Sequence, residues 1–204
     1  MRMVDGRVSG FGRVVHVCVD VQSMFAEETP WHAPWLNKVL PAIEAIVDRE
    51  PERTIFTRFV PPEHPEEAER AWVDYYRKWS QMTRSQLAPG MVDLVPSLQR
   101  YVPPARVLDK PIYSPWLTSG LHHALTEAGV TTLVVSGGET DICVLATVLG
   151  AIDLGYRVLL PTDAVFGSAD QTHDAALSLY RSRFGQQLTA CTTAELLDNW
   201  DDFE

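Results

Sequence analysis

Length, composition and charge already restrict what this protein can be. The chain has 204 residues, of which 46% are hydrophobic and 22% are charged, and its formal net charge at pH 7 is −10. These values are typical of a single globular domain, which we expect to span residues 1–204. A nucleic-acid partner is not expected, because phosphate recognition relies on clustered Lys and Arg.

Neither a membrane span nor a disulfide framework is predicted. The first apolar run, at residues 14–21, is too short to cross a bilayer, and no other stretch qualifies. The three cysteines are odd in number and widely spaced, and no CxxC motif is present, which indicates reduced thiols. We therefore expect a cytoplasmic protein without a membrane partner.

Short apolar runs alternate with longer helical patterns along the chain. In chain order, we expect a strand at 14–20, a helix at 34–50, a strand at 53–59, a helix at 66–81, a strand at 106–109, a helix at 117–128, a strand at 131–136, a helix at 140–154, a strand at 157–162, a helix at 169–183, a strand at 188–192 and a final helical turn at 194–200. Pro41 is expected to limit or kink the first helix. The proline-containing segment 87–104 is expected to be a surface excursion over the functional site.

Strands that alternate with helices predict an α/β fold. Each helix connects two parallel strands by a right-handed crossover, and the helices cover both faces of the sheet. We therefore expect a three-layer α-β-α doubly wound fold with a six-stranded parallel sheet. In such a sheet the ligand crevice lies outside the carboxyl ends of the strands.

Three residues with reactive side chains fall at these carboxyl ends. Asp20 closes the first strand, Lys110 follows the third, and Cys143 lies in the first turn of the helix after the fourth. Each of them alone is better explained as a cap, a solvated strand end or a core thiol. Three such residues at the same edge of one sheet indicate a catalytic site.

Cys143 carries the most chemical information of the three. The turn Ser-Gly-Gly-Glu-Thr-Asp-Ile precedes it, and the positive end of a helix dipole favours a thiolate. A nearby Lys110 would lower the thiol pKa further, so we expect Cys143 to be partly thiolate at neutral pH. Asp20 would accept the thiol proton and later donate it to a leaving amine. Cys18, in the middle of the first strand, is interpreted as an inert core residue.

Three segments around these residues resemble a known family. Val-Asp-Val-Gln at 19–22, Asp-Lys-Pro-Ile-Tyr-Ser-Pro-Trp at 109–116 and Gly-Gly-Glu-Thr-Asp-Ile-Cys-Val at 137–144 resemble the signature segments of the isochorismatase-like superfamily. This group includes nicotinamidases, N-carbamoylsarcosine amidase and ureidoacrylate-type amidohydrolases. The resemblance implies that Asp20, Lys110 and Cys143 form the catalytic triad of a cysteine hydrolase.

Further site residues and an assembly are also expected. The backbone N–H groups of Glu139 and Cys143 would hold the oxyanion of a tetrahedral intermediate. Family resemblance implies a cis peptide bond between Gly138 and Glu139, and a homodimer or homotetramer. We expect the substrate-binding wall to be formed by Gln22, Phe25, Tyr113, Trp116 and Phe166.

Two departures from the family pattern narrow the expected chemistry. Nicotinamidases carry an Asp-x-His metal motif after the second strand, but residues 57–65 read Thr-Arg-Phe-Val-Pro-Pro-Glu-His-Pro, so neither a metal nor another cofactor is expected. Isochorismatases that cleave a vinyl ether lack the nucleophilic cysteine. The presence of Cys143 therefore favours a C–N bond in a small amide, carbamoyl or ureido substrate.

Three other functions stay open. The chain could be a vinyl ether hydrolase in which Cys143 is incidental, a catalytically silent binding domain, or a redox protein with Cys143 as a peroxidatic thiol. An aromatic stripe at helical spacing either packs against the sheet or a second subunit, or covers the pocket. The stripe consists of Trp72, Tyr75, Tyr76 and Trp79.

Overall fold

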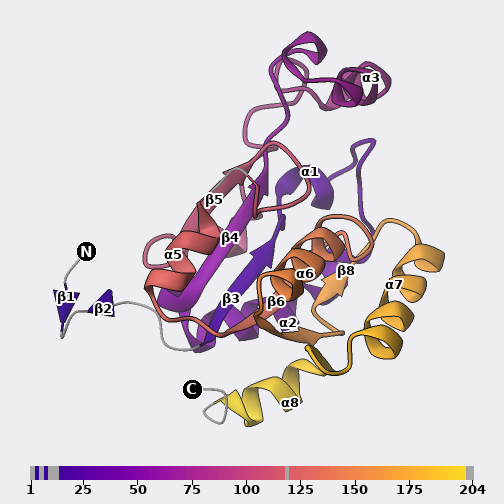
Figure 1. The fold of residues 1–204 in the computed structure, drawn as a ribbon. Coiled ribbons are helices and arrows are strands. Elements are labelled where there is room, and N and C mark those ends of the chain that lie inside the picture. Colours follow the sequence, from indigo (N-terminus) through magenta and orange to yellow (C-terminus); the bar gives the residue numbers. More distant parts are fainter. Residues whose placement is uncertain (1–2, 5–6, 9–13, 118–119, 201–204) are drawn as a thin grey trace.

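The computed structural model describes residues 3–4, 7–8, 14–117 and 120–200 (Figure 1). The strands among these residues are β1 (Met3–Val4), β2 (Arg7–Val8), β3 (Val14–Val19), β4 (Thr54–Phe59), β5 (Arg106–Lys110), β6 (Thr132–Gly138), β7 (Arg157–Pro161), β8 (Val165–Phe166) and β9 (Leu188–Cys191). The α-helices are α1 (Ser23–Ala26), α2 (Leu36–Arg49), α3 (Ala71–Lys78), α4 (Pro96–Gln99), α5 (Leu121–Glu127), α6 (Cys143–Asp153), α7 (Asp170–Arg183) and α8 (Thr193–Asp198). Short 3-10 helices are η1 (Pro51–Arg53), η2 (Pro65–Glu67) and η3 (Ser80–Met82). No helix in the described part of the chain is long and apolar enough to cross a membrane.

The main sheet contains the six predicted strands in the order β5-β4-β3-β6-β7-β9. Neighbouring strands are parallel, with Val17 of β3 opposite both Ile55 of β4 and Val135 of β6. The short strand β8 also pairs in parallel with the end of β6, where Gly137 is opposite Val165. The predicted α/β class and the six strands are therefore confirmed. The sequence does not predict β8, because two residues are too few to establish a periodic pattern.

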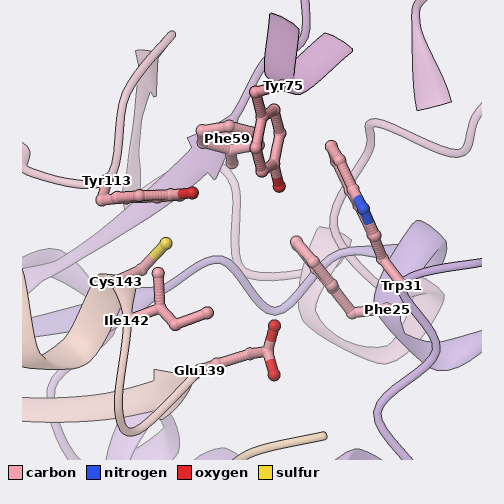
Figure 2. A pocket seen from close by; sticks show the side chains of 8 residues that line it. All are labelled: Phe25, Trp31, Phe59, Tyr75, Tyr113, Glu139, Ile142 and Cys143. Atoms are coloured by element: carbon pink, nitrogen blue, oxygen red, sulfur yellow. The ribbon is translucent and has the colours of Figure 1, made fainter. Parts of the chain in front are cut away.

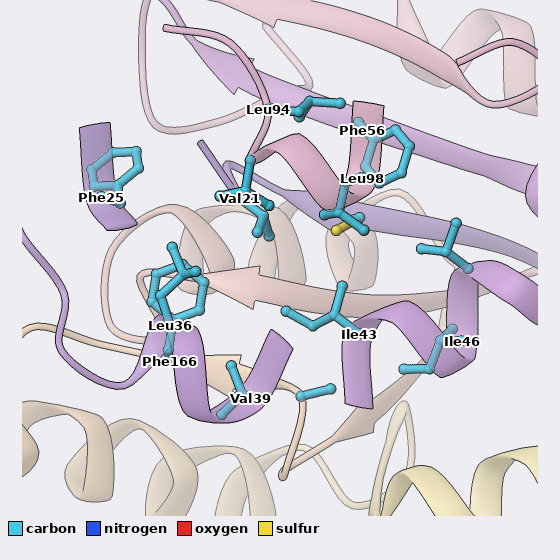
Figure 3. Close-up of a cluster of buried hydrophobic side chains, with 14 of the residues drawn as sticks. Val21, Phe25, Leu36, Val39, Ile43, Ile46, Phe56, Leu94, Leu98 and Phe166 are labelled. Atoms are coloured by element: carbon cyan, nitrogen blue, oxygen red, sulfur yellow. The ribbon is translucent and has the colours of Figure 1, made fainter. Parts of the chain in front are cut away.

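Helices cover both faces of this sheet and enclose two hydrophobic cores. Side chains alternate along β3, so Val14 and Cys18 belong to one core and Val15, Val17 and Val19 to the other. On the first face α2 contributes a buried apolar side that includes Leu36 and Ile43 (Figure 3). On the second face α5, α6 and α7 pack against the sheet. The layers are those of the predicted doubly wound fold.

The structure corrects one part of the prediction for Pro41, that it limits the helix, and it divides a second predicted helix. Pro41 does not end the first helix, because α2 continues through it to Arg49 and is fixed by the apolar side that it buries. The expected helix at 66–81 is divided into η2, α3 and η3. Arg70 adopts a positive φ of 54° directly before α3, so a continuous helix cannot pass through this residue.

The segment 87–104 lies elsewhere than expected. None of its residues lines the cavity described below, and Leu94, Val95, Leu98 and Tyr101 are buried in the core that also contains α2. Burial of these apolar side chains stabilises the packed position of the segment, although the prolines around them are typical of exposed turns. The segment that carries α3 instead extends beyond the carboxyl ends of β4 and β5 (Figure 1).

Candidate active site

Asp20 is held at the carboxyl end of β3 by hydrogen bonds to β4. Its φ of 50° turns the chain out of the strand. The Asp20 N–H donates to the Thr57 carbonyl oxygen at 3.1 Å, and the Thr57 hydroxyl donates to Asp20 Oδ1 at 2.6 Å. Both residues are fully buried. Thr57 therefore fixes one oxygen of this carboxylate.

Lys110, the last residue of β5, contacts the second carboxylate oxygen of Asp20. Its Nζ donates to Asp20 Oδ2 at 2.6 Å and to the Ile112 carbonyl oxygen at 3.3 Å, and it lies 5.3 Å from the centroid of the Phe59 ring. Burial disfavours the charged ammonium, but the Asp20 carboxylate and Cys143 outweigh this effect and raise the pKa of Lys110. Asp20 and Lys110 are therefore a buried ion pair.

Cys143 is the first residue of α6 and is only 6% exposed. Burial raises the pKa of its thiol well above the ordinary value, and Asp20 raises it further while Lys110 acts in the opposite direction. The expectation of a partial thiolate at neutral pH is therefore wrong. A buried sulfur beside a carboxylate stays protonated at rest, because much of the Lys110 charge is balanced by Asp20.

A cavity that is partly open to solvent lies against Cys143 (Figure 2). Most of its wall is aromatic, and the rings contact one another: the centroid of Trp31 is 6.2 Å from that of Phe25 and 6.0 Å from that of Tyr75, and the centroid of Tyr113 is 6.0 Å from that of Phe59. The cavity can admit a small molecule to the sulfur. Its lining residues are Phe25, Trp31, Phe59, Tyr75, Tyr113, Glu139, Ile142 and Cys143.

Two backbone N–H groups in the turn from β6 into α6 have no acceptor among the described residues. The peptide bond between Gly138 and Glu139 is cis, as predicted. Within the described residues, neither the Glu139 N–H nor the Cys143 N–H donates a hydrogen bond to the protein, whereas the Glu139 carbonyl accepts from the N–H of Val144 at 3.0 Å. Both donors are thus available to an oxygen atom of a bound molecule.

Close packing explains why this turn contains two adjacent glycines. Gly137 has a φ of 97°, and a Cβ there would lie 2.1 Å from the Val19 carbonyl oxygen. A Cβ at Gly138 would lie 2.2 Å from the Phe166 ring. Any side chain at either position would displace the strand or the ring that supports the turn.

Thr140 fixes the middle of the turn. Its N–H and its hydroxyl both donate to the Phe166 carbonyl oxygen, at 2.8 and 2.9 Å, and the Tyr180 hydroxyl donates to the Thr140 carbonyl oxygen at 2.7 Å. His173 Nδ1 lies 2.9 Å from the Thr140 hydroxyl oxygen. Because that hydroxyl already donates to Phe166, His173 serves as the donor and has a structural role.

Two of the five expected wall residues, Phe25 and Tyr113, line the cavity, but Gln22 does not. The Gln22 side chain donates to the carbonyl oxygens of Phe59 at 3.0 Å and Val92 at 2.6 Å, and it accepts the Phe59 N–H at 2.7 Å. Its polar atoms therefore bind two backbone segments, at Phe59 and at Val92, instead of facing a ligand. The prediction for Gln22 is corrected accordingly.

Trp116 and Phe166 also lie outside the cavity lining. The indole N–H of Trp116 donates to the Thr147 carbonyl oxygen at 2.9 Å, and its ring stacks on Tyr156 with centroids 5.8 Å apart. Trp116 therefore packs along α6. Phe166 has no exposed surface, and its ring packs against Gly138.

Several residues of the site are not predicted by the sequence analysis. Phe59 ends β4 and could be recognised as an aromatic at a carboxyl strand end, and Tyr75 belongs to the aromatic stripe, whose role the sequence does not decide. Trp31 and Thr57 give no local signal, because their roles depend on contacts with distant segments. The Glu139 side chain also faces the cavity, while one of its oxygens accepts the Ser168 N–H at 2.8 Å.

Comparisons with known proteins identify the family. The isochorismatase domain matches residues 14–192. A probable inactive nicotinamidase of Arabidopsis thaliana is 26% identical over 161 residues, which are 77% of this chain and 82% of that protein. The uncharacterized isochorismatase family protein YaaI of Bacillus subtilis is 29% identical over 82 residues, 40% of this chain and 45% of its own. Streptothricin hydrolase of Streptomyces noursei is 38% identical over 84 residues, 38% of this chain and 30% of its own. The matches therefore span less than half the length of the last two proteins.

Solved structures share the fold. A cysteine hydrolase from Pseudomonas syringae superposes with a TM-score of 0.80 at 20% identity, and the match covers 94% of each chain. The N-carbamoylsarcosine amidase from Thermoplasma acidophilum gives 0.71 at 19% identity over 89% of this chain and 97% of its own. The pyrazinamidase of Pyrococcus horikoshii, in complex with zinc, gives 0.65 at 22% identity over 89% of this chain and 99% of its own. With the domain match over most of its length, the chain belongs to the isochorismatase family of hydrolases.

Proposed function

We propose that the protein is a cysteine amidohydrolase that cleaves a C–N bond of a small amide, carbamoyl or ureido compound through a thioester on Cys143. The observation that carries this proposal is the placement of Cys143 against the cavity, where its thiol interacts with a buried Asp20–Lys110 ion pair. A nucleophile, a base and a positive charge are the groups that acyl transfer by a thiol requires.

In the first stage, Asp20 takes the proton of the Cys143 thiol as the sulfur attacks the carbonyl carbon of the substrate. The negatively charged oxygen of the tetrahedral intermediate accepts hydrogen bonds from the backbone N–H groups of Glu139 and Cys143. Asp20 then gives its proton to the nitrogen, the C–N bond breaks, and the amine or ammonia leaves. The product on the protein is a thioester.

In the second stage, Asp20 takes a proton from a water molecule as its oxygen attacks the thioester carbon. The tetrahedral intermediate collapses, the C–S bond breaks, and the sulfur recovers its proton from Asp20. Lys110 stays protonated throughout and stabilises whichever partner carries the negative charge. The raised pKa of the Cys143 thiol makes this base necessary, because little thiolate forms without it.

Mass spectrometry of the intact protein tests the proposal. Mixing with a panel of carboxamide, carbamoyl and ureido compounds should produce a covalent acyl adduct on Cys143 and release ammonia or an amine. Cys143→Ala should abolish both, while Cys191→Ala, at a half-buried cysteine outside the cavity lining, should keep them. Turnover above a few per cent in Cys143→Ala would rule out covalent catalysis.

A further inference from the structure

Glu139 introduces a negative charge into an otherwise apolar and aromatic cavity. The side chain lines the cavity together with five aromatic rings, and Figure 2 shows its carboxylate directed toward the space between Cys143 and Phe25. One oxygen accepts the Ser168 N–H. Within the described part of the chain, the Glu139 carboxylate has no ion-pair partner.

The charges around the cavity do not cancel. Asp20 and Lys110 lie 2.6 Å apart and neutralise each other, and the Cys143 thiol is protonated because burial and Asp20 raise its pKa. Glu139 is the charged side chain that remains among the residues lining the cavity. A substrate therefore enters a site with a net negative charge, where an anionic group would be repelled.

The aromatic wall of the cavity also favours a positively charged ligand. Trp31, Tyr75 and Tyr113 surround one side of the cavity, and the centroids of Tyr75 and Tyr113 are 6.5 Å apart. Burial raises the pKa of both tyrosines, so their hydroxyls stay neutral. The faces of such rings attract a cation and give an anion no favourable contact.

From this arrangement we propose that the site selects amides whose non-reacting part carries a positive charge. The charged group that fits this site is an alkylated ammonium. The carbonyl lies against Cys143, and the cation lies between the Glu139 carboxylate and the aromatic rings. Glu139 is thus a specificity-determining residue through its side chain, in addition to the role of its backbone N–H. The assignment of the reacting bond rests on the proposed function, but the preference for a cation is a separate property of the cavity.

Three small primary amides that differ only in their charged end test the inference. Trimethylammonioacetamide is cationic, tert-butylacetamide is its neutral isostere, and malonamate is anionic. Their dissociation constants are measured by calorimetry on the Cys143→Ala variant, so that binding is observed without turnover. We expect the cation to bind at least about tenfold more tightly than its neutral isostere, and malonamate to bind more weakly than both.

Removal of the Glu139 charge should remove this preference. Glu139→Gln, added to Cys143→Ala, keeps an acceptor for the Ser168 N–H, and the cation-to-neutral ratio should fall to about threefold or less. Glu52→Gln is the matched control, because Glu52 is exposed in η1 before the amino-terminal end of β4. It changes the net charge equally and should leave the ratio unchanged.

Each outcome decides between the inference and its rivals. Equal or tighter binding of the neutral or anionic amide, failure of the cation to bind, or a tenfold ratio that survives Glu139→Gln would each overturn the assignment. If Glu139→Gln does not fold, the comparison of the three ligands still decides. Cation-selective binding without ammonia release from any amide by the unaltered protein would refute the proposed function alone. Turnover that favours the neutral amide would refute this inference alone.

Discussion

The Lys110 ammonium lies 2.6 Å from the Asp20 carboxylate, and neither side chain has more than 1% of its surface exposed. A buried charge whose partner is removed is strongly destabilising, whereas a satisfied pair is tolerated. The pair therefore places a carboxylate, balanced by the Lys110 ammonium, next to a thiol that burial keeps protonated. Under the proposed function, this relationship governs the reactivity of Cys143.

Substitutions of the two charged partners should move the Cys143 pKa in opposite directions. Asp20→Asn removes a carboxylate that raises the thiol pKa, and Lys110→Met removes an ammonium that lowers it. The pH midpoint of iodoacetamide labelling should therefore fall in Asp20→Asn and rise in Lys110→Met. Labelling is followed on the Cys143 peptide by mass spectrometry. Unchanged midpoints in both variants would mean that neither charge acts on the sulfur.

Thr57 should be required to position Asp20. Thr57→Val removes the hydroxyl that donates to Asp20 Oδ1 at 2.6 Å but keeps the shape of the side chain. We expect kcat/KM to fall by about 10- to 100-fold, the range for a lost hydrogen bond to a charged group. Thr54→Val is the control, since Thr54 is buried at the amino-terminal end of the same strand. Similar losses in both variants would indicate a general effect on the sheet.

Activity should not depend on a metal ion. The Asp-x-His motif is missing after β4, and no three His, Cys, Asp or Glu side chains in the described ranges are grouped so that they could hold a metal. Extended EDTA treatment should leave turnover unchanged, with elemental analysis as the check on metal content. Loss of activity that zinc or manganese restores would contradict this prediction and would indicate a metal-dependent enzyme of the nicotinamidase type.

His16 should make the fold sensitive to mild acid. It is buried in β3 with Nε2 2.7 Å from Ser136 Oγ, and burial lowers its pKa from 6.5 to about 3. Between these values the unfolded chain binds a proton that the folded protein excludes, so stability falls as pH falls. One such group contributes roughly 1.4 kcal/mol per pH unit.

Urea denaturation at a series of pH values below 6.5 measures this effect as a slope. His16→Leu should have a shallower slope than the unaltered protein, by about one proton. His123→Gln serves as the control, because the His123 side chain is 80% exposed, and its slope should not change. An equal slope in His16→Leu would show that His16 is protonated in the folded state.

The amino-acid sequence by itself determines the fold class and the placement of three reactive residues. The apolar runs at residues 14–20 and 131–136 indicate buried strands, and the alternation of strands with helices along the chain makes those strands parallel. Once those strands are parallel, Asp20 and Cys143 must lie at the same edge of the sheet. The adjacent glycines at 137 and 138 mark the turn between β6 and α6 in the sequence, whereas the contacts with Val19 and Phe166 that exclude larger residues there are tertiary.

Only the tertiary structure decides the wall of the cavity and the protonation of the nucleophile. Trp31, Phe59 and Tyr75 come from separate segments and meet only after the chain has packed, so no local pattern reveals them. The sequence places Gln22 where its side chain can face either a ligand or the backbone, and three hydrogen bonds in the folded chain assign it to the backbone. The thiol pKa depends on how completely the sulfur is buried. Burial is a property of the whole packed structure, whereas the period of a strand is a property of a few neighbouring residues.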